Sequence, residues 1–307
     1  MNERLLEKLE QAPFVYQYTS IEALFAILEG YRKKREQGCL PIKASCIYNV
    51  NDPREMKHGY DAVKMFLPQY EAKLQNSMNL SEVFEDKKYE EQCIECLDKK
   101  PKDDMIQYGI VPYTISFSGN RDFLPMWSMY ARNCKGVCMK FESSELINSI
   151  GDSTQVDFVS YAGDNVDYIM EEHFSMLYEW DASNCTNPMT IDEKINELSI
   201  LCNCISPFIK SQEWSYENEF RIVCYHHFGP NLFELDHNSI RHFLIHGIEK
   251  TKIAKFVYYP IKVNALKEII VGTLANYDVV EHILRKELEE CLLNDVEITP
   301  SSIAISK

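Results

Sequence analysis

The chain has 307 residues, of which 45% are hydrophobic and 26% are charged, so it can bury a sizeable folded core. Its 47 acidic residues outnumber its 32 basic residues and give a formal net charge of −15. This excess repels phosphate backbones, and we do not expect non-specific nucleic-acid binding. No apolar run approaches the roughly 20 residues that a helix needs to cross a bilayer, so we expect no membrane insertion.

The cysteines favour a reducing compartment. There are 11 of them, an odd number, and the chain begins with MNERLLEKLEQ, which lacks the apolar core of a signal peptide. We therefore expect a reduced, cytoplasmic protein. Cys93 and Cys96 form a CxxC pair in an acidic segment, but the second pair that a structural zinc site needs is missing. Cys202 and Cys204 are too close together for such a pair. His242 and His246 are four apart on an expected helix, but no acid with metal-ligand spacing accompanies them. We predict no metal site.

The N-terminal part predicts a strand followed by a helix. Residues 14–18, FVYQY, have the aromatic and β-branched content of a strand. Thr19 then opens TSIE, a capping box in which Glu22 reaches back to the cap. The apolar periodicity predicts a helix over residues 20–29, and Gly30 is expected to end it.

The middle of the chain predicts further strands and a helical segment. Residues 40–47 favour a strand, and residues 60–105 are acidic, rich in lysine and typical of an inserted helical hairpin. Strands are expected at residues 113–118 and 137–141, with a short helix between them that Asp122 caps.

The second half continues the same mixture of strands and helices. TIDE at residues 190–193 is a second capping box, and its helix should continue towards Ile205. The other expected elements are strands at 157–162, 217–225, 255–260 and 268–272, helices at 167–180 and 276–291, and a terminal strand in VEITPSSIAI. Without a linker or repeat, we predict one α+β domain over residues 1–307. Because strands outnumber the helices that could cross between them, the sheet should be mixed and mainly antiparallel.

The stretch WSYENEFRIV concentrates charge on one strand. Extended backbone would place Glu217, Glu219 and Arg221 on one face and Phe220 and Ile222 on the other. The acids could hold a small polar ligand, or Arg221 could bridge both carboxylates in an ion ladder that adds only modest stability. The residues alone leave both interpretations open.

An ordered series of motifs extends over residues 14–275, with residues 60–105 least covered. It contains NDP, SFSGNRDFLPMWSMYARNCKGVCMKF, VSYAGD, KSQEWSYENEFRIV and EIIVG. This series resembles the bacterial domain-of-unknown-function 2971 family, whose pattern has NDP, a serine-bearing strand, MWxxYA, GVC, a K…WxxExEWR block and a late IxxG. That family is grouped at a distance with ADP-ribosyltransferases. The resemblance therefore implies a sheet core of ADP-ribosyltransferase-like type with a helical insertion.

ADP-ribosyltransferases share an Arg or His on a first strand, a Ser or Tyr strand motif, and a Glu, often as ExE, before a later strand. Carried onto this sequence, these places fall to Gln17 or Tyr18, to Ser116 with Ser118, and to Glu217 with Glu219. Gln17 departs from the expected Arg or His, and Phe220 replaces the usual Trp.

The resemblance also implies a role for each residue. Glu219 would stabilise a ribose oxocarbenium ion, and Glu217 would orient or deprotonate the acceptor. The two serines would brace Glu219, and Tyr16 or Tyr18 would stack on a ligand ring. For the cations, the interpretations are Arg221 as orienter of the acids, and Arg121 and Lys210 as pyrophosphate ligands or plain surface cations. Trp127 and Trp214 are interpreted as core anchors.

The predicted function is therefore binding of nicotinamide adenine dinucleotide (NAD). The protein would transfer ADP-ribose to an acceptor that the sequence does not identify, such as a protein, or would hydrolyse the dinucleotide. The alternative is a catalytically inactive module that binds a nucleotide or a protein in bacterial defence or in a toxin system. Gln17 is the feature that favours this alternative.

Overall fold

The computed structural model describes residues 3–49, 54–74, 110–151, 154–161, 166, 168–171, 190, 193, 198, 201–227, 241–246 and 251–305. Its strands are β1 (Phe14–Thr19), β2 (Cys39–Cys46), β3 (Ile110–Ser118), β4 (Val137–Glu142), β5 (Thr154–Phe158), β6 (Ser160–Tyr161), β7 (Ile209–Lys210), β8 (Glu219–His227), β9 (Arg241–His246), β10 (Thr251–Lys262), β11 (Leu266–Val271) and β12 (Glu297–Pro300). Its α-helices are α1 (Glu3–Gln11), α2 (Ile21–Lys33), α3 (Glu55–Leu74), α6 (Leu124–Tyr130), α7 (Ser143–Ile147) and α10 (Tyr277–Cys291). Short 3-10 helices include η4 (Ser206–Phe208) and η5 (Gln212–Glu217).

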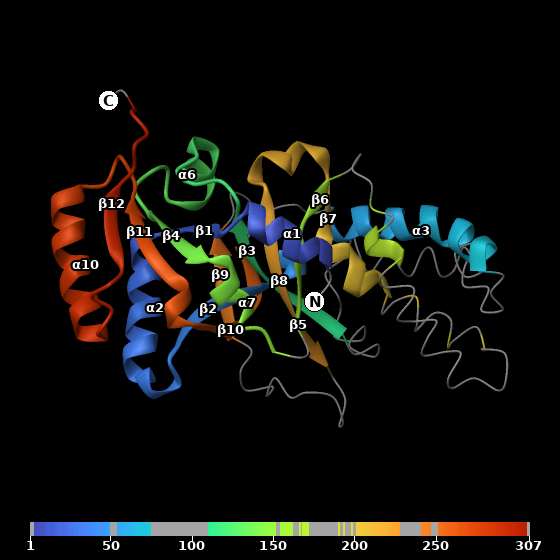
Figure 1. The fold of residues 1–307 in the computed structure, drawn as a ribbon, viewed down its shortest axis with the longest axis horizontal. Helices are drawn as coiled ribbons and strands as arrows, with labels where there is room; N and C mark the ends of the chain where they lie inside the picture. The colour runs from blue at the N-terminus through green and yellow to red at the C-terminus, as the bar shows by residue number, and fades with distance from the viewer. Residues whose placement is uncertain are drawn as a thin grey trace.

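One large sheet organises the described residues (Figure 1). Its strands follow the order β12-β11-β4-β1-β3-β2-β10-β9, with β8 paired to β3 and β5 paired to β8. Every pair in this sheet is antiparallel except the parallel pair β11–β12. The predicted α+β class and the mixed, mainly antiparallel sheet are confirmed.

The main hydrophobic core covers one face of the sheet. In β2, for example, Leu40, Ile42, Ala44 and Cys46 alternate into this core with the period of two that a half-buried strand requires. Leucines of α1, α2 and α10 pack against the same face. Figure 1 shows α2 and α10 side by side at one end of the sheet, where Arg32 of α2 pairs with Glu287 of α10 at 3.4 Å.

Two smaller apolar clusters cover parts of the opposite face. One contains Tyr16 and Tyr18 of β1 beneath Trp127 of α6. The other contains Val223 and Tyr225 of β8 beneath α3 and the helical residues 168–171 and 201–205. Between the two clusters, this face of the sheet is polar.

The sheet divides along one edge of β3. On its other edge, β3 pairs with β8 continuously from Ile110 to Ser118. On the divided edge it pairs with β2 only at Tyr113 and Thr114, and with β1 only at Ser118. Among the described residues, no strand occupies this edge at residues 115–117, so β1 and β2 diverge there.

Helix α2 differs from its prediction at both ends. Ser20 is the N-cap in place of Thr19, and its hydroxyl accepts a hydrogen bond from the backbone N–H of Ala23 at 3.1 Å. The helix also continues through Gly30 to Lys33. Gly30 allows close packing, because a Cβ atom there would lie 2.7 Å from Cγ of Pro41 on β2.

Asp122 does not cap α6 as predicted. The N-cap residue is Phe123, and Asp122 adopts a left-handed conformation with φ 52°. Its carboxylate accepts hydrogen bonds from Trp127 Nε1 at 2.8 Å and from the hydroxyls of Ser301 and Ser302 at 2.6 Å. Asp122 therefore ties α6 to the segment that follows β12.

The segment with His242 and His246 forms β9 and not the predicted helix. Its register with β10 fixes it as a strand at the end of the sheet. The capping box at Thr190 is present: the backbone N–H of Thr190 donates to Glu193 Oε2 at 2.7 Å, and the N–H of Glu193 donates to Thr190 Oγ1 at 3.3 Å. Strand β12 and helix α10, which Asn276 caps, also agree with the prediction.

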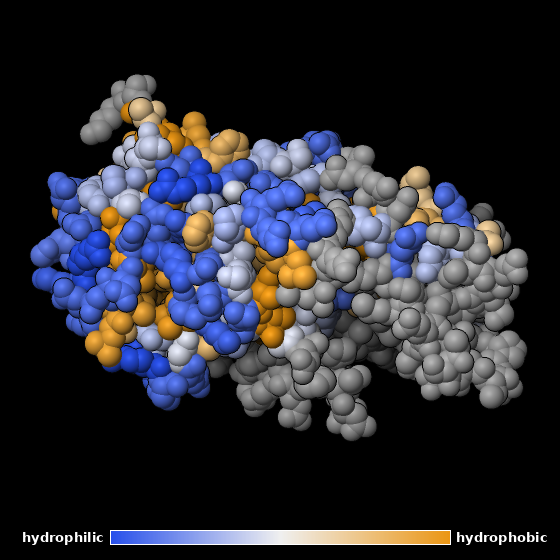
Figure 2. Space-filling view, in the orientation of Figure 1, coloured by the Kyte–Doolittle hydropathy of each residue, from blue (hydrophilic) through white to orange (hydrophobic). Residues whose placement is uncertain are grey.

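Helix α3 overlaps the start of the expected insertion at residues 60–105. Its buried residues Tyr60, Val63 and Leu67 contribute to the apolar cluster over β8. Residues 75–109, with Cys93 and Cys96, lie outside the described residues, as do most of the predicted helix 167–180 and the NDP motif. In the part that is described, no helix combines the length and the apolar character needed to cross a membrane. Hydrophilic side chains predominate over α2 and α10 in Figure 2.

Candidate functional site

A cavity of about 400 Å³ lies where β1 and β2 diverge beside β3. Eight of the nine predicted site residues line it: Tyr16, Gln17, Tyr18, Ser116, Ser118, Glu217, Glu219 and Arg221. The apolar part of the wall includes Ala23, Ala26 and Ile27 of α2. The three sequence segments therefore meet at one cavity, whose size falls within the range of small-molecule sites.

Glu219 is the first residue of β8 and lies almost wholly out of solvent, at 4% exposure. Arg221 binds it with two parallel hydrogen bonds, Nε to Oε1 at 2.7 Å and Nη2 to Oε2 at 2.8 Å. Lys210 of β7 adds a third contact, with its Nζ 3.2 Å from Oε2. The guanidinium of Arg221 also donates to the backbone carbonyl of Pro207. This bidentate geometry fixes the direction of the carboxylate.

The alternating pattern predicted Glu217 as part of the strand, but in the structure Glu217 lies outside it. It ends the 3-10 helix η5, and Asn218 then turns the chain through a left-handed conformation with φ 44°. The two acids still converge, because Lys210 Nζ contacts Glu217 Oε2 at 2.6 Å as well as Glu219. Tyr130 of α6 donates a hydrogen bond to the other oxygen of Glu217. Lys210 therefore bridges both carboxylates.

The two carboxyl groups have opposite pKa shifts. Burial and the neighbouring charge of Glu219 raise the pKa of Glu217 above its ordinary value, against the opposing effect of Lys210. Burial alone would also raise the pKa of Glu219, but Arg221 and Lys210 outweigh it and hold that pKa below its ordinary value. A contact from the Ser116 hydroxyl lowers it further. Glu219 is therefore ionised at neutral pH, and Glu217 binds a proton more readily.

The serines of β3 have different surroundings. Ser118 is buried, and its hydroxyl donates to the backbone carbonyl of Glu217 at 2.5 Å and accepts from the N–H of Asn120 at 3.1 Å. Ser118 therefore braces the turn before β8. The prediction that it braces the side chain of Glu219 is wrong. Ser116 is exposed to the cavity and is the serine that supports the Glu219 carboxylate.

The three predicted residues of β1 also differ from one another. The hydroxyl of Tyr18 donates to the carbonyl of Asn120 at 2.8 Å and accepts from the N–H of Phe123 at 3.0 Å, and its ring meets Trp127 edge-on at 5.1 Å. Tyr18 is therefore a core residue with one edge at the cavity. Tyr16 is buried on the same face, whereas Gln17 points to the other face and is half-buried.

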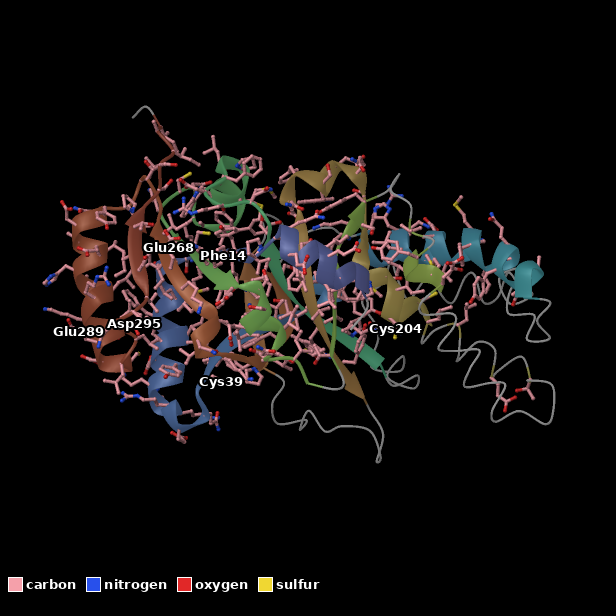
Figure 3. All side chains as sticks on the ribbon, viewed as in Figure 1. Phe14, Cys39, Cys204, Glu268, Glu289 and Asp295 are labelled. Atoms are coloured by element: carbon pink, nitrogen blue, oxygen red, sulfur yellow. The ribbon has the colours of Figure 1, made fainter. Side chains whose placement is uncertain are left out.

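Arg121 is the predicted site residue that lies away from the cavity. Its Nη2 contacts Glu268 Oε1 of β11 at 2.8 Å, and Lys140 of β4 contacts the same carboxylate at 3.4 Å. Lys140 Nζ also lies 4.1 Å from the centre of the Phe14 ring, and Figure 3 labels Phe14 and Glu268 in this part of the sheet. Arg121 thus belongs to a separate ion cluster on β11 and β4.

Several lining residues were missed or misread in the sequence. Lys210 was interpreted as a surface cation or a pyrophosphate ligand, yet it is 4% exposed and its Nζ lies 4.7 Å from the centre of the Trp214 ring. Tyr130, Lys43 and Thr114 also line the cavity. Tyr130 belongs to the MWxxYA motif and Lys210 begins the K…WxxExEWR block, but no local pattern marks Lys43 or Thr114, because strands that are distant in sequence bring them together. The prediction that Trp127 anchors the core is confirmed, since this residue is 1% exposed.

Comparison with known proteins supports the family resemblance for part of the chain. Residues 126–222 match the family model described as "Protein of unknown function (DUF2971)". The matched segment extends from α6 to Ile222 in β8 and includes both acids of the site. No curated protein and no solved structure matches the chain. The similarity to ADP-ribosyltransferases stays a prediction.

Proposed function

We propose that the cavity binds NAD and that the protein transfers ADP-ribose to an acceptor or hydrolyses the dinucleotide. One observation carries the proposal: the three segments that the resemblance singled out, around Gln17, Ser116 and Glu219, line a single cavity. Their convergence is a property of the fold, because the cavity occupies the place where β1 leaves β3.

Glu219 is the residue we assign to charge stabilisation. Breaking the bond between nicotinamide and ribose leaves positive charge on the sugar, and a fixed carboxylate stabilises that charge in a site shielded from water. Glu219 is ionised and is held in one orientation by Arg221. Ser116 faces the cavity beside this carboxylate, so a ribose hydroxyl of the substrate would take the place of the Ser116 contact.

Glu217 is the residue we assign to proton transfer. Its raised pKa makes it a better proton acceptor than Glu219, and both acids line the same cavity. The incoming hydroxyl or water would lose its proton to Glu217 as it bonds to the ribose carbon that nicotinamide leaves. Lys210, which contacts both acids, would keep the charge of the pair balanced during that transfer.

A catalytically inactive binding module is the second candidate. The observation that favours it is the pairing of both acids with buried cations, since Arg221 and Lys210 already neutralise the two carboxylates. Gln17 adds to it, because the resemblance expects an Arg or His at that position. On this view the cavity would bind a nucleotide or a segment of a partner protein without turnover.

Release of nicotinamide separates the two candidates. The protein is incubated with NAD labelled in the nicotinamide ring, with and without cell lysate as a source of acceptor, and free nicotinamide is measured. The enzyme proposal expects release that falls by about a hundredfold or more in Glu219→Gln, the size of effect seen when one electrostatic contact to a transition state is removed. Glu289→Gln, an exposed acid on α10 labelled in Figure 3, is the matched control and should keep full activity.

If the wild-type protein releases no nicotinamide from NAD, with or without cell lysate, the enzyme proposal is overturned. Thermal melting then tests binding alone, because a ligand at a hundred times its dissociation constant adds about 2.7 kcal/mol to the free energy of unfolding. A shift with NAD but no turnover would support the inactive binding module.

A further inference from the structure

A row of hydroxyl groups extends along the cavity wall from the acids towards β2. Thr114 and Ser116 lie two residues apart on β3 and share a face, with their Cα atoms about 6.6 Å apart along the strand. Ser45 of β2 is the direct cross-strand partner of Thr114. All three residues line the cavity from the same face of the sheet.

Thr114 is the residue that indicates a missing ligand. Its side chain is 3% exposed, and its Oγ1 is buried with no hydrogen-bond partner in the part of the chain that the structure describes. An unpaired buried hydroxyl costs free energy on the order of 1–3 kcal/mol, and folded proteins pair nearly all such groups. Thr114 lines the cavity, so a molecule bound there would supply the partner of this hydroxyl once it displaces the atoms that now cover it.

Lys43 brings positive charge to the same end of the cavity. It lies two residues before Ser45 on β2, is the cross-strand partner of Tyr258 on β10, and lines the cavity with both. Its Nζ lies 5.0 Å from the centre of the Phe256 ring, and burial lowers the pKa of its ammonium group to about 8. The ammonium group still carries its charge at neutral pH.

The charge of the cavity differs in sign from the charge of the whole chain. Among the described lining residues, three cations, Lys43, Lys210 and Arg221, stand against the two carboxylates of Glu217 and Glu219. Within a chain of net charge −15, this cavity is a local site that favours an anion.

We propose that Lys43, Ser45, Thr114 and Ser116 form an oxyanion subsite that binds a phosphate group of the ligand. Hydroxyl donors and an ammonium group match the acceptor oxygens of a phosphate, and each contact to a charged oxygen is stronger than one to a neutral group. In assigning this phosphate to a dinucleotide, the inference rests on the proposed function: the pyrophosphate would lie along β2 and β3, and the scissile ribose would lie beside Glu219.

Inorganic pyrophosphate is the probe for this subsite. Thermal melting is measured in sodium pyrophosphate and in sodium chloride of equal ionic strength, for the wild-type protein and for the variants Lys43→Gln, Thr114→Val and Lys286→Gln. We expect pyrophosphate alone to raise the melting temperature of the wild type. Lys43→Gln should weaken pyrophosphate binding by about tenfold or more, since it removes one charged contact. Lys286→Gln, an exposed lysine on α10, should leave binding unchanged.

Thr114→Val distinguishes a ligand contact from a structural one. Valine has the shape of threonine without the hydroxyl, and the hydroxyl has no partner among the residues that the structure describes. Without pyrophosphate, this variant should melt at the same temperature as the wild type or at a higher one, because an unsatisfied buried group is removed. With pyrophosphate, its rise in melting temperature should be smaller than that of the wild type.

Three outcomes would overturn the subsite. In the first, pyrophosphate raises the melting temperature of the wild type no more than chloride does. In the second, pyrophosphate raises the melting temperature of the wild type and of all three variants equally. In the third, Thr114→Val melts at a lower temperature than the wild type in chloride alone. The nicotinamide assay is run on the same variants, which keeps the two proposals separate. Pyrophosphate binding without nicotinamide release would retain the subsite and remove the enzyme proposal, and the reverse pattern would remove the subsite alone.

Discussion

Lys210 holds the two acids of the site together, although in the sequence it is a single lysine in IKSQEW. Its ammonium group contacts Glu217 and Glu219, and all three side chains are at most 5% exposed. Replacing Lys210 by Met would leave two buried carboxylates without the cation that they share. Removing one partner of a buried ion pair costs about 3–5 kcal/mol, so Lys210→Met should lower the free energy of unfolding by an amount in this range. Chemical denaturation measures it.

The surface pair of Lys33 and Glu29 provides a matched control for this prediction. Both residues are well exposed on α2, so Lys33→Met should leave the denaturation midpoint nearly unchanged. The double variant Lys210→Met with Glu217→Gln should recover part of the loss, because it removes the carboxylate that loses its cation, whereas Glu219 keeps its pair with Arg221. An unchanged midpoint in Lys210→Met alone would contradict the geometry of the cluster.

Glu219 should also give stability a defined dependence on pH. Its pKa in the folded protein lies below its ordinary value of 4.5, so its contribution is present above pH 4.5 and is lost as the pH falls further. Glu217 has a raised pKa and contributes with the opposite sign, losing its contribution as the pH rises through its folded pKa. The difference in unfolding free energy between the wild type and Glu219→Gln should therefore shrink below pH 4.5.

Urea denaturation of both proteins between pH 3 and pH 7 checks this expectation, with Glu289→Gln as the exposed control. A difference that stays constant below pH 4.5 would show that the pKa of Glu219 is not lowered on folding.

At the scale of single elements, the sequence predicts the existence of an element better than its ends. The strands β1, β2, β3, β4 and β12 and the helices α2 and α10 agree with hydrophobic periodicity and capping residues, which act locally. The errors fall where a distant contact decides the conformation. Gly30 packs against Pro41, Asp122 binds the serines after β12, and the backbone carbonyl of Asn218 accepts a hydrogen bond from the N–H of Gly119. A local pattern does not contain such contacts.

Helix α3 offers a test of one such distant contact. A Cβ atom on Gly59 would lie 2.2 Å from Cα of Ser206 in η4, so the backbones of the two helices approach more closely there than any other residue permits. Alanine is the better helix former by about 1 kcal/mol, but overpacking against backbone costs about 1–3 kcal/mol or more. Gly59→Ala should therefore lower the melting temperature.

Gly151→Ala is the matched control, because a Cβ atom at Gly151 meets nothing within 4 Å. It should melt with the wild type. If Gly59→Ala were as stable as the control, the close contact between α3 and η4 would be contradicted.

At the scale of the whole molecule, the site follows from how the sheet is covered. One face is covered by the main core, and two apolar clusters cover parts of the other face. The polar strip between them, on β3 and β8, is where the cavity opens. The sequence predicted eight of the residues around it, because an ordered set of motifs was visible there. It did not predict Lys43, Thr114 or the bridging role of Lys210, which depend on strand pairing across long stretches of chain.

Equilibrium dialysis with labelled NAD tests most directly the claim that NAD binds in the cavity beside β3. Every role assigned to a residue depends on a ligand in that cavity. The wild type should bind NAD saturably. Ser116→Phe, which places a ring in the cavity at an exposed position of β3, should abolish binding without unfolding the protein. Asn294→Phe, at an exposed position beyond α10, should bind as the wild type does. Binding that survives in Ser116→Phe, or none in the wild type, would contradict the account.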